Sequence, residues 1–82
     1  AKDSFWKKNR TAEINERQRK VINRLLDAGP GEFVGGLTTR KYVSIAKTSR
    51  VTAYREITDL LEKGLIRQNE GKGRNVSYDI DL

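Results

Sequence analysis

The most constraining feature of the sequence is the close succession of two residues that are suited to begin helices, Thr38 and Ser49. Hydroxyl side chains at such positions accept hydrogen bonds from the free backbone amides of a first helical turn. After Thr38, the apolar residues Tyr42, Ile45 and Ala46 follow helical spacing. The pattern therefore predicts a short helix over residues 38–46 and, after a very short connection, a second helix.

The second helix is expected to run from Ser49 to Gly64, the residue type that most often ends a helix. Its apolar residues recur at three- and four-residue spacing, and they are Ala53, Ile57, Leu60 and Leu61. This spacing places one apolar face toward neighbouring helices and leaves the opposite face to solvent.

An earlier helix is predicted over the segment NERQRKVINRLLDAG, from Asn15 to Gly29. Asn15 with Gln18 has the spacing at which two side chains satisfy each other's backbone amides. The apolar residues behind this cap are Val21, Ile22, Leu25 and Leu26, and the basic residues expected on the solvated face are Arg17, Arg19, Lys20 and Arg24. Gly29 is placed to end the helix.

Beyond Gly64 the pattern changes to that of a hairpin. Residues 65–68 are strand-like, residues 71–73 are turn-like, and Val76, Tyr78 and Ile80 alternate with polar neighbours. Leu37 is a candidate for a further, very short strand. Three helices, the last two closely joined, followed by a hairpin predict a mainly α fold with a small β hairpin, the winged helix-turn-helix. We expect this domain to cover residues 14–82, with a linker or the remnant of a preceding domain over residues 1–13.

Composition excludes most catalytic and metal chemistry. The chain has no Cys and no His, so it lacks thiolate ligands, the usual general base and the commonest metal ligand. We therefore expect no catalytic residue, no metal site, no cofactor and no enzyme activity in this segment. No apolar run approaches the ~20 residues needed to cross a bilayer, so we expect no membrane contact, and a cytoplasmic location is the natural one for a chain without Cys.

Charge points to an anionic partner, since the net charge is +6 and no acidic residue occurs between Glu32 and Glu56. If the helix after Ser49 enters a major groove, its first turns meet base edges. The residues predicted to contact bases are Arg50, Val51, Thr52, Tyr54 and Arg55. Those predicted to contact phosphates are Thr38, Arg40, Lys47, Ser49, Arg67, Lys72, Arg74 and Asn75. Acidic residues in the second half of the helix, Glu56, Asp59 and Glu62, would repel phosphates.

Several of these residues also have a purely structural interpretation. Thr38 and Ser49 are needed as helix caps whether or not a phosphate lies beside them, and cations around residues 71–74 also suit an ordinary solvated turn. Tyr42 and Tyr78 are expected in or beside the core with the hydroxyl in water. A protein-docking or dimerisation module is the alternative function, with Phe33, Val51 and Tyr54 as its candidate apolar contacts.

The segments NERQRKVINRLLDAG and GGLTTRKYVSIAKTSRVTAYREITDLLEKGLI, with the glycine-rich wing, resemble the winged-helix region at the C-terminal end of Fic family proteins. The likeness runs from Asn15 to Tyr78. Fic proteins typically attach AMP from ATP to hydroxyl side chains through a His-Pro-Phe-x-x-Gly-Asn-Gly-Arg loop, which has no counterpart here. The resemblance thus implies a regulatory or targeting module that follows a Fic domain in the parent chain. Under the protein-docking alternative, the module would dock substrates or a second subunit for that Fic adenylyltransferase domain. The sequence departs from the commonest helix-turn-helix pattern in the turn, where glycine is usual and this chain has Lys47 and Thr48.

Overall fold

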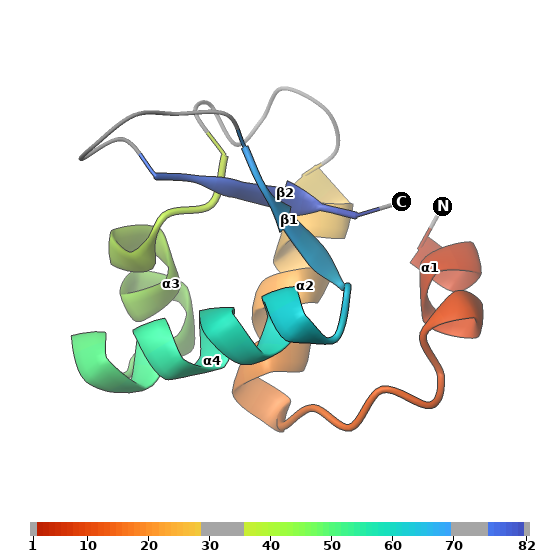
Figure 1. Cartoon of the computed structure of the whole chain (residues 1–82), viewed down its shortest axis with the longest axis horizontal. Coiled ribbons are helices and arrows are strands. Elements are labelled where there is room, and N and C mark those ends of the chain that lie inside the picture. The colour runs from red at the N-terminus through yellow and green to blue at the C-terminus, as the bar shows by residue number, and fades with distance from the viewer. Residues whose placement is uncertain (1, 29–35, 70–75, 82) are drawn as a thin grey trace.

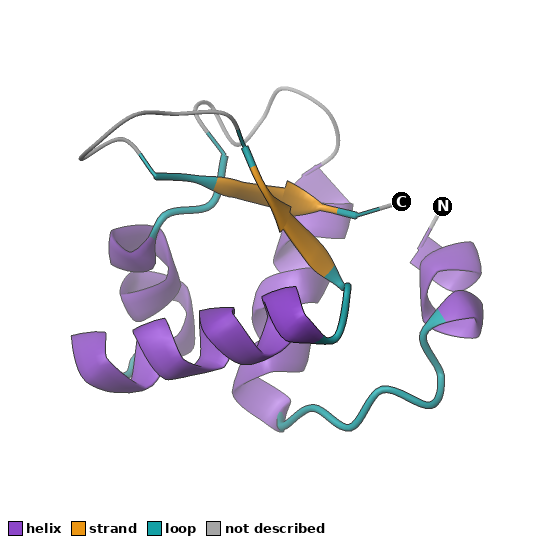
Figure 2. Cartoon of the chain, in the orientation of Figure 1, coloured by secondary structure: helices purple, strands orange, loops and turns teal. Residues whose placement is uncertain are grey.

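The protein is described here by a computed structural model that covers residues 2–28, 36–69 and 76–81. Within these residues the chain forms helices and one small antiparallel hairpin (Figures 1 and 2). The elements in chain order are α1 (Lys2–Lys8), α2 (Glu16–Ala28), α3 (Thr39–Ala46), α4 (Arg50–Glu62), β1 (Ile66–Gln68) and β2 (Tyr78–Ile80). The mainly helical architecture with a hairpin is as the sequence predicts, and it is compatible with a winged-helix-like fold.

Helix α2 begins with the reciprocal cap that its sequence predicts. The Asn15 amide donates to Gln18 Oε1 at 2.9 Å, and the Gln18 amide donates to Asn15 Oδ1 at 2.9 Å. Behind this cap, Val21 and Ile22 are fully buried, and Leu25 is 7% exposed. Because α2 packs against α1, α3, α4 and β2, it is the central element of the fold (Figure 1).

The predicted caps of the next two helices are also confirmed. Thr38 Oγ1 accepts a hydrogen bond from the Lys41 amide at 3.1 Å, and Ser49 Oγ accepts one from the Thr52 amide at 3.2 Å. Between the helices, Lys47 has φ 53° and ψ 54°, in the left-handed region. This is the conformation that glycine adopts without strain. The turn between α3 and α4 therefore has the usual backbone shape although its residue is lysine.

Gly64 ends α4 in the left-handed conformation, with φ 78°. Its amide donates to the Leu61 carbonyl at 3.1 Å and the Leu65 amide donates to the Leu60 carbonyl at 3.0 Å, the paired bonds of a Schellman motif. The chain then turns directly into β1, which pairs with β2 with Ile66 opposite Ile80 and Gln68 opposite Tyr78.

Leu37 adds a single bridge to the hairpin on the side of Tyr78. The two residues exchange both backbone hydrogen bonds at 2.8 Å, as expected for the very short strand predicted at Leu37. Gly36 precedes this bridge with φ 78°, and a Cβ there would lie 2.9 Å from the Tyr78 carbonyl oxygen. The close approach of the two backbones thus requires glycine at this position.

The core lies where α2, α3, α4 and the hairpin meet. Its largest fully buried side chains are Val21, Ile22, Leu37, Tyr42, Ile57, Leu60, Leu65 and Ile66. Tyr78, 7% exposed, belongs to it as expected. The prediction that the Tyr42 hydroxyl reaches water is wrong: the residue has no exposed surface, and its hydroxyl donates to Glu56 Oε1 at 2.8 Å.

Residues 2–8 form a helix that packs on α2, where the sequence analysis expects a linker or a remnant of a preceding domain. Phe5 is 2% exposed and joins the common core. Trp6 packs edge-on to Phe5, donates from Nε1 to Asn23 Oδ1 at 2.8 Å, and lies under the Arg19 guanidinium at 4.4 Å. Helix α1 is therefore attached to the rest of the fold, and the domain boundary at residue 14 stays a prediction.

No helix in the described part of the chain is long and apolar enough to cross a membrane.

Candidate nucleic-acid interface

Helix α4 buries one side and exposes the other. The buried side chains are Ala53, Glu56, Ile57 and Leu60, which follow helical spacing and face α2, α3 and the hairpin. On the opposite side, Val51 is 69% exposed and Tyr54 is 64% exposed. The two lie three residues apart, so they share the outward face of the first two turns.

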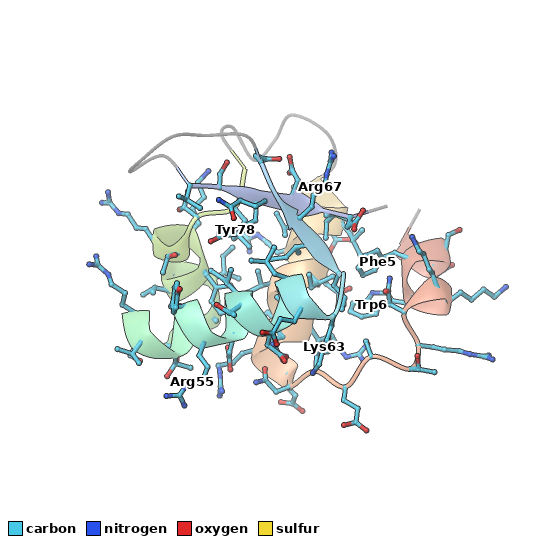
Figure 3. All side chains as sticks on the ribbon, viewed as in Figure 1. Phe5, Trp6, Arg55, Lys63, Arg67 and Tyr78 are labelled. Atoms are coloured by element: carbon cyan, nitrogen blue, oxygen red, sulfur yellow. The ribbon has the colours of Figure 1, made fainter. Side chains whose placement is uncertain are left out.

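Cations surround this outward face. Arg50 and Arg55 are exposed on α4 itself, Lys47 is exposed in the turn before it, and Arg40 is exposed in the first turn of α3. Among the described residues, these four form no ion pair with a carboxylate. Arg55 extends away from the core in Figure 3. The start of α4 is therefore a positive, solvent-facing surface whose charges no carboxylate in the described ranges neutralises.

Ser49 and Thr52 contribute to this surface mainly as a cap. Ser49 Oγ accepts from the Thr52 amide and donates to Thr52 Oγ1 at 3.0 Å. Thr52, predicted to contact bases, is half-buried and has its hydroxyl engaged in this pair. The Thr38 hydroxyl is occupied in the same way by the Lys41 amide. These hydroxyls fix the helix starts, which the purely structural interpretation of both residues requires.

Arg67 lies apart from the cations of α4. It is exposed on β1, opposite Asp79 in the hairpin register. Side chains directly opposite each other in an antiparallel pair are close enough to interact, so Arg67 has an acidic neighbour. Figure 3 shows Arg67 and Arg55 at opposite sides of the molecule. The predicted phosphate contacts Lys72, Arg74 and Asn75, like Phe33 of the docking alternative, lie outside the described residues.

Glu56 is the main departure from the site predicted by sequence. It is 6% exposed, so it does not present a charge to an incoming phosphate. Arg17 Nη2 lies 2.6 Å from Glu56 Oε2 in a salt bridge, Asn15 Nδ2 donates to the same oxygen at 2.7 Å, and Tyr42 donates to Oε1. Glu56 thus joins α2, α3 and α4 at one buried point.

The protonation of Glu56 follows from these contacts. Burial is the largest single influence and disfavours the charged carboxylate. Hydrogen bonds from Arg17, Tyr42 and Asn15, together with the charge of Arg17, outweigh it and lower the pKa of Glu56 below its ordinary value. Burial and the hydrogen bond to Glu56 raise the pKa of Tyr42. At neutral pH the cluster therefore holds a carboxylate, a guanidinium and a neutral phenol.

The other two acidic residues of α4 differ from each other. Asp59 accepts from Gln18 Nε2 at 2.9 Å and pairs with Lys63 Nζ at 3.0 Å, and these two hydrogen bonds lower its pKa. Lys63 also donates to the Glu13 carbonyl, which ties the end of α4 to the segment before α2. Glu62 is exposed at the last turn. The predicted repulsion of phosphates from the second half of α4 therefore depends chiefly on Glu62.

The burial of Glu56 is indicated by its position in the sequence, although its charge suggests an exposed residue. Glu56 lies three residues after Ala53 and directly before Ile57, within the apolar spacing of the helix. An acidic residue at such a position is buried only when it is paired. Its partner Arg17, expected on the solvated face of α2, has a half-exposed side chain but directs its guanidinium to Glu56.

No group of three or more His, Cys, Asp or Glu in the ranges 2–28, 36–69 and 76–81 is arranged to hold a metal ion. Neither a scan against models of known protein families nor a search of curated proteins finds a match to this chain.

Proposed function

We propose that this chain is a DNA-binding winged-helix module in which α4 enters the major groove of duplex DNA. The observation that carries the proposal is the first half of α4, where Arg50 and Arg55 are exposed beside a solvent-facing helix side and form no ion pair with any residue that the structure describes. A helix of this kind fits the major groove, and arginine there can donate two hydrogen bonds to guanine.

The burial of Glu56 strengthens this proposal. With its charge withdrawn from the surface and paired with Arg17, it does not oppose a phosphate near Arg55. Lys47 and Arg40, exposed on the turn and on α3, supply cations for the flanking phosphates, which position a protein without reading sequence. We further propose, from the resemblance in its sequence, that the module regulates or targets a Fic domain in the parent chain.

The exposed apolar surface of Val51 and Tyr54 favours a second candidate, a protein-docking or dimerisation module. Large apolar side chains left in solvent often mark a binding surface. This candidate predicts binding that changes little with salt, whereas binding to DNA weakens steeply as salt rises.

Fluorescence anisotropy of the chain with random-sequence duplex DNA, across a salt series, tests the first candidate. We expect micromolar affinity at low salt and a log–log slope of about −0.9 for each phosphate contacted. An affinity weaker than ~10⁻⁴ M at low salt, below ordinary non-specific binding, would rule the function out.

The double variant Arg50→Ala/Arg55→Ala identifies the surface. It should lose at least tenfold in affinity, roughly the discrimination of one arginine contact, without loss of stability, because both side chains are exposed. Lys20→Ala/Arg24→Ala on α2 is the control, since it removes the same charge from another exposed face. Equal losses in the two double variants would show that net charge, not α4, determines binding.

A further inference from the structure

The packing of α4 does not explain why position 51 carries an exposed apolar side chain, Val51. It is the most exposed large hydrophobic side chain in the described part of the chain. At about 100° per residue, it points almost directly away from the mean direction of the buried residues of α4. It therefore contributes nothing to the core, and a branched apolar side chain in the first turn gains little as a helix former.

The neighbours of Val51 restrict what it can contact. Arg55 lies one turn further along the same outward face, and Arg50 precedes Val51 directly. Lys47 is exposed in the turn just before the helix. An apolar side chain bordered by exposed cations is poorly suited to a large dry protein interface, whose centre is depleted in charge. It is well suited to a polyanion that offers an apolar group between its charges.

Duplex DNA has one such group in the major groove, the C5-methyl of thymine. The other features of the base edges in that groove are hydrogen-bond donors and acceptors and C–H groups much smaller than a methyl. A valine that enters the groove in the first turn of a helix has no polar atom to match the donors and acceptors, so burial against the methyl is its most favourable contact.

Resting on the proposed function, we propose that Val51 is a specificity-determining residue that reads a thymine methyl. Arg55 then binds a guanine close to that thymine. Side chains four residues apart on a helix have their Cβ atoms about 5–6 Å apart, and bases on one strand are spaced by about 3.4 Å. The thymine and the guanine therefore lie within about two base pairs of each other.

The test begins by selecting bound duplexes from a random pool with the full 82-residue chain. Each thymine of the selected duplex is then replaced singly by deoxyuridine, which removes only the methyl. We expect one replacement within two base pairs of a guanine to weaken binding by about three- to fivefold, the effect of one buried methyl group. Replacing that thymine by cytosine should weaken binding further, and 5-methylcytosine should recover part of the loss.

Val51→Ser should bind the thymine duplex about three- to fivefold more weakly and should no longer distinguish thymine from uracil at that position. Because Val51 is exposed, this variant should keep its fold, which circular dichroism checks. Thr58→Ser is the matched control: it also removes a methyl group from α4, but one turn beyond Arg55, and it keeps the hydroxyl that bonds the Tyr54 carbonyl. It should discriminate between thymine and uracil as the unchanged chain does.

The outcomes separate the two proposals. Sequence-selective binding that is indifferent to every uracil replacement, or discrimination that persists in Val51→Ser, would overturn the assignment of Val51 and leave the DNA-binding function standing. Binding with no preferred sequence would also overturn the assignment alone. Absence of duplex binding at low salt would overturn both, and Val51 with Tyr54 would then belong to a protein-docking surface.

Discussion

Charge is used differently on the two sides of helix α4. On the inward side, Glu56 is buried and bonded to residues of α2 and α3. On the outward side, Arg50 and Arg55 are exposed and have no ion pair among the described residues. The inward charge contributes to holding three helices together, whereas the outward charges contribute nothing visible to the fold.

Helix α4 thereby combines a fixed orientation with an exposed surface. Glu56 lies beside Arg55 in the chain, so any rotation of α4 that moves one moves the other. Glu56, through Arg17 and Tyr42, is one of several buried residues of α4 that set the direction in which Arg55 projects. Variants of the inward side of α4 test whether its contacts can change without altering the outward surface.

The largest effect is expected from Glu56→Ala. It leaves the buried Tyr42 hydroxyl without its acceptor and opens a gap between helices. We expect it to lower the free energy of unfolding by about 2 kcal/mol, in the range for a buried polar group left unpaired. Urea denaturation followed by circular dichroism measures this, with Glu62→Ala as the exposed control on the same helix, expected to change stability by less than about 0.5 kcal/mol.

The same variant tests the separation of the two sides. At a temperature where Glu56→Ala is still folded, its affinity for duplex DNA should stay within about threefold of the unchanged chain if α4 keeps its orientation. A loss as large as that of Arg50→Ala/Arg55→Ala would show that the inward cluster is also required for binding.

Tyr42→Phe removes only the phenol hydroxyl of the cluster. Glu56 keeps Arg17 and Asn15 as partners, so we expect a loss of about 1 kcal/mol in the free energy of unfolding, the usual net value of one hydrogen bond. Ile45→Val, at a half-buried apolar position of α3, serves as a comparison without a hydrogen bond. A Tyr42→Phe chain as stable as the unchanged one would mean that the hydroxyl bond contributes nothing.

Acid should reduce the stabilisation that the ionised Glu56 carboxylate contributes on the inward side of α4. The pKa of Glu56 is lower in the folded chain than its ordinary value of 4.5. The stabilisation is therefore complete above about pH 4.5 and is lost as the pH falls through the lower, folded value. Asp59, whose pKa is also lowered, adds a dependence of the same sign.

Glu56→Gln isolates the contribution of Glu56 because it retains shape but has no charge to lose. Denaturation of both chains from pH 7 to pH 3 should show a stability difference that narrows in acid, while the effect of Asp59 remains in both. A difference that is constant with pH would contradict the lowered pKa.

The smallest effect is expected at Lys47, which combines a left-handed backbone with an exposed cation. Lys47→Gly relieves the crowding of Cβ but adds freedom to the unfolded chain, so a net gain of about 0.5 kcal/mol in stability is expected. Lys47→Ala loses the same charge and keeps the Cβ. Thermal denaturation should rank glycine above alanine, and both variants should reduce the salt slope of DNA binding by the same amount, about one contact.

Much of the local structure could be predicted from single residues and their spacing. The caps at Asn15, Thr38 and Ser49 form as expected, and Gly64 ends α4. These features depend on hydrogen bonds between residues a few positions apart, so the sequence specifies them without knowledge of the fold. The exposure of Val51 and Arg55 follows in the same way, from the period of the buried residues beside them.

The tertiary structure alone decided which charges are surface charges. Arg17 and Glu56 lie far apart in the chain and meet only because α2 packs against α4. Phe5 likewise has no helical pattern around it, and its burial depends on the packing of α1 against α2. Composition and spacing by themselves thus determined α2, α3 and α4, the caps at their starts, the end of α4 at Gly64 and an exposed basic face. Long-range packing decided the partner of each buried polar group, because that partner comes from another element.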